Sequence, residues 1–189
     1  MDVEGIYDRY EDLFFPLHGQ HQAANAAVAI AAVEELFGER LPQEVVRDGL
    51  ADVSSPGRIE VISRDPLVVI DGAHNPEAFE ALSLTMQEEF AGVEWTLVIG
   101  AMGDKNIDAM LGSLEGIVVS VVATSAEYER AFVPGQVAAA AERALPGVPV
   151  VEVEGVAAAV RHASAITDDR GAILIAGSLY VVGEARGLF

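Results

Sequence analysis

Short runs rich in β-branched residues alternate along this chain with alanine-rich segments of helical period. The runs are 58–63, 67–71, 95–101, 117–123, 148–153 and 172–176. The segments between them are 76–90, 107–114, 134–144, 156–166 and 179–186. Continuous apolar runs are typical of parallel strands that helices cover on both faces. The alternation therefore predicts an α/β fold, a Rossmann-like three-layer sandwich with about six strands.

The first two predicted strands are separated by only Arg64, Asp65 and Pro66. A connection between parallel strands needs a dozen or more residues, so these two strands are expected to pair as an antiparallel hairpin. The sheet is then mostly parallel, with one antiparallel strand at its edge.

The first fifty residues have a different character. An alanine-rich helix is expected over 20–37 and a shorter one over 41–50, and nothing before them has the periodicity of a long element. Residues 54–57, Ser-Ser-Pro-Gly, have the composition of a linker. We therefore expect a short helical segment (1–53), followed by the Rossmann-like domain (54–189).

Composition limits the classes of protein to which the chain can belong. Its 189 residues are 51% hydrophobic, which is enough to build one core. No apolar run reaches the roughly 18 residues of a membrane span, and residues 1–4 lack the basic region of a signal peptide. Without cysteine, a disulfide, a zinc–thiolate site or a thiol nucleophile is excluded. We expect a soluble, cytoplasmic protein with no membrane partner.

The charge is strongly negative. Thirty Asp and Glu residues against eleven Lys and Arg residues give a formal net charge of −19, which argues against nucleic acid or an anionic membrane as a partner. All the basic residues are arginine except Lys105. This bias resembles the cytoplasmic proteins of salt-loving archaea, in which concentrated salt screens the repulsion between carboxylates. An acidic protein of an ordinary cell remains the alternative.

Ligands bind to open parallel sheets beyond the carboxyl ends of the strands, so the turns after the strands are the places to search. The first such turn, 71–76, reads Asp-Gly-Ala-His-Asn-Pro. Asn75 and Pro76 are explained as the N-cap and first residue of a helix, whereas Asp71 and His74 are not. A carboxylate can hold a ribose hydroxyl and an imidazole can donate to a phosphate, although such a pair can also be structural.

The turn at 103–106, Gly-Asp-Lys-Asn, follows the third predicted strand. Asp104 or Asn106 can cap the next helix, and that would explain the turn without any ligand. It would not explain Lys105, because composition favours arginine for a solvated surface cation. A lysine is a compact charge that suits a carboxylate or an acyl phosphate.

Two further positions carry weaker signals. Ser178 lies in the turn after the last predicted strand, where it can bind a ligand or simply cap the next helix. Arg58 lies at the linker, where its guanidinium can hold phosphates between domains or be solvated.

Taken in order, these residues resemble the folylpolyglutamate synthase and dihydrofolate synthase family, a branch of the Mur ligases. The similarity runs through Pro-Leu-His-Gly-Gln-His-Gln at 16–22 with Asn25, Pro-Gly-Arg at 56–58, Asp-Gly-Ala-His-Asn-Pro at 71–76, Asp-Lys at 104–105 and Gly-Ser-Leu-Tyr at 177–180. It covers nearly the whole chain, and the string at 71–76 is specific to this branch.

The resemblance implies a ligase of folate biosynthesis and one-carbon metabolism. ATP phosphorylates the terminal carboxylate of a folate or dihydropteroate, the amine of glutamate attacks the acyl phosphate, and ADP and phosphate leave. The resemblance also implies roles for six residues: Asn25 and Asp71 towards the adenosine, Arg58 towards the ATP phosphates, His74 near the transferred phosphoryl group, and Lys105 with Ser178 towards the glutamate and the acyl phosphate.

One departure from the family limits what the chain can do. The phosphate-binding string Gly-x-x-x-x-Gly-Lys-Ser/Thr is missing, and the ligands for Mg²⁺ and the folate pocket would also lie in the missing part. The chain therefore resembles a C-terminal domain with the last helices of the central ATPase domain attached, excised from a longer enzyme. It would be inactive alone, with neither ATP nor Mg²⁺ tightly bound and no metal site of its own. A separate subunit that completes its site in trans is the alternative.

Two other classes of function remain open. One is a Rossmann-like domain that holds a nucleotide without catalysis, although no Gly-x-Gly-x-x-Gly string follows a strand. The other is a structural or interaction domain, which the missing phosphate loop favours. Calorimetric measurement of ATP and glutamate binding would discriminate these classes from a ligase fragment.

Overall fold

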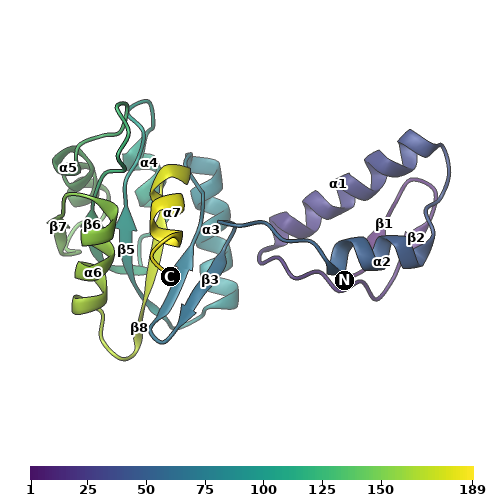
Figure 1. The fold of residues 1–189 in the computed structure, drawn as a ribbon, viewed down its shortest axis with the longest axis horizontal. Helices are drawn as coiled ribbons and strands as arrows, with labels where there is room; N and C mark the ends of the chain where they lie inside the picture. Colours follow the sequence, from purple (N-terminus) through teal and green to yellow (C-terminus); the bar gives the residue numbers. More distant parts are fainter. The chain divides into compact units, whose positions relative to one another are not determined.

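A six-stranded sheet with the order β3-β4-β8-β5-β6-β7 forms the centre of residues 57–189 (Figure 1). Its strands are β3 (Glu60–Arg64), β4 (Leu67–Ile70), β5 (Glu94–Ile99), β6 (Val118–Ala123), β7 (Val150–Glu152) and β8 (Gly171–Ala176). β3 pairs antiparallel with β4, and the other neighbours are parallel. The structure, a computed structural model that describes residues 1–189, thus confirms the predicted fold class and the antiparallel edge strand.

Helices cover both faces of this sheet (Figure 1). They are α3 (Pro76–Glu89), α4 (Ile107–Gly112), α5 (Pro134–Ala144), α6 (Val156–Ile166) and α7 (Leu179–Arg186). α3, α4 and α5 share one buried apolar cluster with the sheet, and α6 and α7 share another. Because successive strand residues point to opposite faces, β8 contributes Leu174 to the first cluster and Ile173 and Ile175 to the second. The result is the predicted three-layer sandwich.

Two strands, β3 and β7, begin two residues later than the sequence predicts. β3 begins at Glu60, and not at residue 58, because Ile59 has a φ of 47° and so is not extended. β7 has only the three residues that pair with β6. Pro149, which precedes β7, has no N–H to donate, and its carbonyl oxygen accepts from the N–H of Val121 at 2.9 Å.

Residues Met1–Pro56 form a second unit with its own small core. It contains β1 (Val3–Glu4), β2 (Arg9–Tyr10), α1 (Gln20–Phe37) and α2 (Gln43–Ala51). Both helices were predicted, but the β1–β2 hairpin was not. The units divide after Pro56, inside the predicted linker, rather than after residue 53. No helix in either unit has the length and apolar character that crossing a bilayer requires.

A buried carboxylate holds the first unit together. Glu34 on α1 is fully buried, and its oxygens accept from the hydroxyl of Tyr10 at 2.7 Å and from the backbone N–H groups of Ile6 and Tyr7. The Tyr10 hydroxyl in turn accepts from the N–H of Leu41 at 3.0 Å. Burial raises the pKa of Glu34, but these hydrogen bonds outweigh it and hold the pKa below its ordinary value of 4.5.

Replacing Glu34 with glutamine is expected to lower the stability of residues 1–56 and to reduce its dependence on acid pH. Because folding lowers the pKa of Glu34, its contribution is complete above about pH 4.5 and is lost as the pH falls through the lower folded value. The protection factor of the Leu41 amide, measured by hydrogen exchange across this range, reports the effect. An equal fall in protection in the wild type and in Glu34→Gln would contradict it.

The melting temperature of residues 1–189 is expected to rise from dilute buffer to molar potassium chloride. The 19 excess negative charges repel one another, and salt screens this repulsion. Circular dichroism melts measure the change, with sucrose as a control that stabilises proteins without screening charge. A melting temperature that stays flat or falls in potassium chloride would show that the acidic surface is not an adaptation to salt.

Candidate functional site

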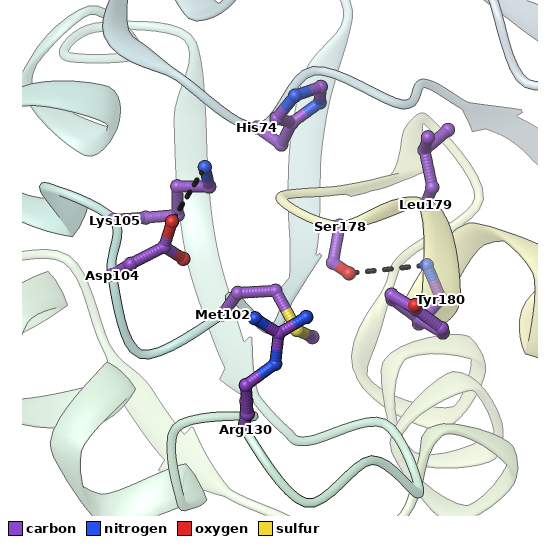
Figure 2. Close-up of a pocket in the computed structure, with 8 residues that line it drawn as sticks. All are labelled: His74, Met102, Asp104, Lys105, Arg130, Ser178, Leu179 and Tyr180. Atoms are coloured by element: carbon purple, nitrogen blue, oxygen red, sulfur yellow. Dashed lines mark hydrogen bonds and ion pairs between the residues drawn. The ribbon is translucent and has the colours of Figure 1, made fainter.

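The turns that follow β4, β5 and β8 bring predicted site residues to one cavity. These strands are parallel neighbours in the sheet, so their carboxyl ends lie at the same edge. The cavity has a volume of about 220 Å³. It is lined by His74, Met102, Asp104, Lys105, Arg130, Ser178, Leu179 and Tyr180 (Figure 2). Three of the six predicted residues, His74, Lys105 and Ser178, therefore share one site.

Two glycines let the strand ends approach closely enough to form this cavity. Gly177, after β8, has a φ of 102°, and a Cβ built on it would lie 2.6 Å from the carbonyl oxygen of Gly100. A Cβ on Gly100, after β5, would lie 2.7 Å from the carbonyl oxygen of Thr124, after β6. Only glycine fits such positions without a shift of the backbone. The N–H of Gly177 also donates to the carbonyl oxygen of Ala73 at 3.0 Å, which ties the turn after β4 to the same edge.

The side chain of Asp71 joins two backbone segments, the start of β3 and the turn after β4. Its side chain is buried, and it accepts from the N–H of Ala73 at 2.7 Å and from the N–H of Ile59 at 2.9 Å. Ile59 is itself buried, with a φ that is unusual for a β-branched residue. Asp71 thus fixes its own turn and the strained start of β3. It does not line the cavity, and its role towards the adenosine stays a prediction.

His74 is oriented by a backbone carbonyl. Its Nδ1 lies 2.8 Å from the carbonyl oxygen of Gly72, and since a carbonyl only accepts, Nδ1 carries the proton. Nε2 is then the nitrogen available to a ligand. The next residues start α3 as predicted, because Asn75 Oδ1 accepts from the N–H of Ala78 at 2.8 Å and Pro76 is the first helical residue.

Lys105 forms an ion pair with Asp104, with 3.1 Å between Nζ and Oδ2. The hydrogen bond from Lys105 lowers the pKa of Asp104. The side chain of Lys105 is only 28% exposed, whereas that of Asp104 is 73% exposed. Asn106 caps α4 by accepting from the N–H of Ala109 at 3.2 Å. The fold therefore uses Asn106 for its cap and leaves Lys105 to the cavity.

Ser178 serves the fold and the cavity together. Its Oγ accepts from the N–H of Tyr180 at 3.2 Å and caps α7 (Figure 2). The side chain is almost fully buried, yet it lines the cavity beside the exposed Leu179. The simple explanation of Ser178 as a helix cap is therefore correct, and it does not exclude contact with a ligand.

The other two predicted residues lie outside the cavity. Arg58 is partly buried, and its Nη1 lies 3.4 Å from the position of a Cβ on Gly72, so it packs against the turn after β4. Asn25 is exposed on α1 in the first unit, where its Nδ2 donates to Oε1 of Gln22 at 3.3 Å. Their roles towards ATP stay predictions.

Sequence reasoning missed Arg130. This residue follows β6 and lines the cavity, but ten arginines make a single one inconspicuous. The loop around it has no glycine turn like those after β4, β5 and β8. The available signal was its place after a parallel strand, since the carboxyl end of β6 lies at the same edge as that of β5.

The lining favours an anion over a metal ion. Lys105, Arg130 and His74 face a single carboxylate, Asp104. Nowhere in residues 1–189 do three or more His, Asp or Glu side chains gather as a metal site would require.

The sequence and the fold are those of a known family. Residues 57–179 match the family described as "Mur ligase, glutamate ligase domain", and the chain belongs to this family. A dihydrofolate synthase/folylpolyglutamate synthase of Mycobacterium tuberculosis is 38% identical over an alignment of 207 positions, which covers 100% of this chain and 42% of that protein. A Haloferax volcanii protein named probable bifunctional folylpolyglutamate synthase/dihydropteroate synthase is 41% identical, over 93% of this chain and 20% of its own length.

Solved structures agree with these relatives. The M. tuberculosis folylpolyglutamate synthase complexed with ADP has a TM-score of 0.92 at 38% identity and covers 97% of this chain and 43% of that one. The bifunctional folylpolyglutamate synthase/dihydrofolate synthase of Yersinia pestis, complexed with AMPPNP and Mn ion, has a TM-score of 0.80 at 28% identity over 96% of this chain and 42% of that one. The chain thus spans less than half the length of the relatives it matches.

Replacing Asp71 with alanine is expected to destabilise residues 57–189. The change leaves two buried backbone N–H groups without an acceptor, which costs about 2–6 kcal/mol in total. Thermal and urea melts measure the loss, and Asp104→Ala is the matched control because this carboxylate is exposed. Equal melting temperatures for Asp71→Ala and the wild type would show that Asp71 does not clamp the fold.

Proposed function

We propose that this chain is the glutamate-ligating part of an ATP-dependent folylpolyglutamate synthase/dihydrofolate synthase. The observation that carries the proposal is the cavity lined by His74, Lys105 and Arg130. Two permanent cations converge on one cavity in a chain whose net charge is −19. Such a cavity suits a ligand with several negative charges, and glutamate and an acyl phosphate are both of this kind.

In the proposed reaction, ATP transfers its terminal phosphoryl group to a carboxylate of a folate or dihydropteroate. The amine of glutamate then attacks the acyl phosphate, an amide bond forms and phosphate leaves. His74 would lie at the transferred phosphoryl group, to which Nε2 donates when both ring nitrogens carry a proton, and Lys105 and Ser178 would hold the glutamate. Charge that develops in such a step is stabilised by polar groups that are fixed in advance. The hydrogen bond to the Gly72 carbonyl orients the His74 ring, and the helix cap orients the Ser178 side chain.

ATP would be bound mainly by residues beyond this chain. The phosphate loop, the Mg²⁺ ligands and the folate pocket belong in this proposal to an ATPase part, and Arg58, Asp71 and Asn25 contribute the remaining contacts to the nucleotide. Residues 1–53 would be the helical tail of that ATPase domain. In support, α1 and its end expose the large apolar side chains of Val28, Leu36 and Phe37, which is typical of a surface that packs on a partner.

We also propose a source organism and a cellular compartment for the protein. The acidic, lysine-poor composition and the similarity to a Haloferax volcanii protein support a halophilic archaeon as its source. The absence of cysteine and the substrates named above are consistent with work in the cytoplasm.

The test compares the chain alone with a completed enzyme, in which residues 1–189 follow an ATPase part in one polypeptide. That part comes from the gene itself or, as a hybrid, from the M. tuberculosis relative. Glutamate-dependent release of ADP in the presence of tetrahydrofolate or dihydropteroate is expected from the completed enzyme and not from residues 1–189 alone. A completed enzyme that binds ATP and glutamate but forms no amide would instead support a non-catalytic binding domain.

Replacing Lys105 with alanine in the completed enzyme is expected to lower kcat/KM for glutamate about ten- to hundredfold. The change removes a charge-assisted contact to a carboxylate or acyl phosphate, and such contacts contribute about 1.5–3 kcal/mol. Arg170→Ala is the control, because Arg170 is exposed just before β8, at the opposite end of that strand from Ser178. Unchanged glutamate kinetics in Lys105→Ala would contradict its assigned role.

A further inference from the structure

Arg130 provides the second permanent cation of the cavity, and it comes from a loop to which no role has been assigned. The loop follows β6, whose carboxyl end lies at the same edge of the sheet as that of β5. In Figure 2 the side chain of Arg130 points from this loop towards the other lining residues, from the side opposite His74. The cavity thus has a cation on two sides, Lys105 on one loop and Arg130 on another.

Backbone hydrogen bonds join the two loops that carry these cations. The N–H of Gly103 donates to the carbonyl oxygen of Arg130 at 2.8 Å, and the N–H of Phe132 donates to the carbonyl oxygen of Ala101 at 2.9 Å. Between these two bonds, Met102 and Ala131 form an antiparallel bridge. The positions of Lys105 and Arg130 relative to each other are therefore fixed by main-chain geometry.

The side chain of Arg130 is also held in place. Its Nη2 donates to the hydroxyl of Tyr128 at 3.2 Å, and its guanidinium carbon lies 5.5 Å from the centre of the Tyr128 ring. That ring stacks on Tyr180 of α7, with 4.3 Å between the centroids and 24° between the planes. Both contacts restrain the guanidinium before a ligand arrives.

Arg130 differs from Lys105 in that no carboxylate contacts its guanidinium, although Asp104 acts on it electrostatically from a greater distance. Lys105 is paired with Asp104, and Arg143 and Arg186 are paired with Asp108 and Glu60. No ion pair joins Arg130 to a carboxylate. A guanidinium restrained in this way can donate two N–H groups to one carboxylate, the bidentate geometry that arginine favours.

We propose that Arg130 binds one carboxylate of the incoming glutamate while Lys105 binds the other, and that Arg130 thereby selects an amino acid with two carboxylates. The proposal rests on the proposed function, because it assigns a specificity residue to the same reaction. Glutamine has the length of glutamate but carries an amide in place of the second carboxylate. With glutamine bound, the guanidinium of Arg130 would face a neutral amide in place of an anion, and a site built for a polar group discriminates against the analogue that lacks it.

The experiment uses the completed enzyme with Arg130 changed to glutamine. The KM for glutamate is expected to rise about ten- to hundredfold, as the loss of a charge-assisted contact predicts, while the KM for ATP and kcat at saturating glutamate stay close to the wild type. The preference for glutamate over glutamine, measured as the ratio of their kcat/KM values, should fall by a similar factor. Arg130→Lys should recover part of both losses, because it keeps the charge but not the planar guanidinium.

The matched control is Arg143→Gln. Arg143 is a nearby exposed arginine that is engaged by Asp108 at 2.8 Å, and its loss should leave the glutamate KM unchanged. Equal effects of Arg130→Gln and Arg143→Gln would overturn the proposal, since the effect would then follow net charge alone. A rise in the KM for ATP without a change for glutamate would also overturn it and would place Arg130 on the nucleotide phosphates.

Two further measurements separate other causes of a loss of activity. Melting temperatures of residues 1–189 with and without Arg130→Gln should agree, which excludes unfolding as the cause. If the wild-type completed enzyme forms no amide with glutamate, the proposed function itself fails. If the wild type is active and Arg130→Gln keeps its glutamate KM and its selectivity, the proposed function stands and the role of Arg130 is wrong.

Discussion

The close approach of the ends of β5, β6 and β8 is the constraint on which the site depends. At Gly100 and Gly177 the backbones come so close that a Cβ would lie 2.6–2.7 Å from a neighbouring carbonyl oxygen. With any larger residue at these two positions the strand ends would have to separate. The turns that carry Lys105, Arg130 and Ser178 would then no longer surround one cavity. The chemistry of the site therefore follows from main-chain packing at the edge of the sheet.

The polar residues of these turns form two groups, one that stabilises the backbone and one that lines the cavity. Asp71, Asn75 and Asn106 are used by the fold, because each accepts hydrogen bonds from backbone N–H groups. Lys105 and Arg130 donate instead to the side chains of Asp104 and Tyr128, which also belong to the loops around the cavity, and both line the cavity. These cations concentrate positive charge at one place on an otherwise acidic chain, and a cavity of this kind attracts a ligand with several negative charges.

The sequence predicts those parts of the structure that depend on local patterns. Periodicity located α1 and the five helices that cover the sheet, and the short connection at Arg64–Pro66 predicted the antiparallel edge. Periodicity did not locate β1 and β2, because strands of two residues are too short to show a period. Arg130 was missed for a different reason. Its place in the cavity depends on a bridge between Met102 and Ala131 and on the stacking of Tyr128 against Tyr180, which are contacts between distant parts of the chain. The strained φ of Ile59 depends likewise on Asp71, twelve residues further along the chain.

The most direct test of this account is a crystal structure of the completed enzyme with glutamate and a non-hydrolysable analogue of ATP. The account predicts glutamate in the cavity lined by His74, Lys105 and Ser178, with its two carboxylates on Lys105 and Arg130 and its amine directed towards the phosphates of the nucleotide. Glutamate bound elsewhere, or a cavity filled by the nucleotide phosphates instead, would contradict the claim that this edge of the sheet is the glutamate site.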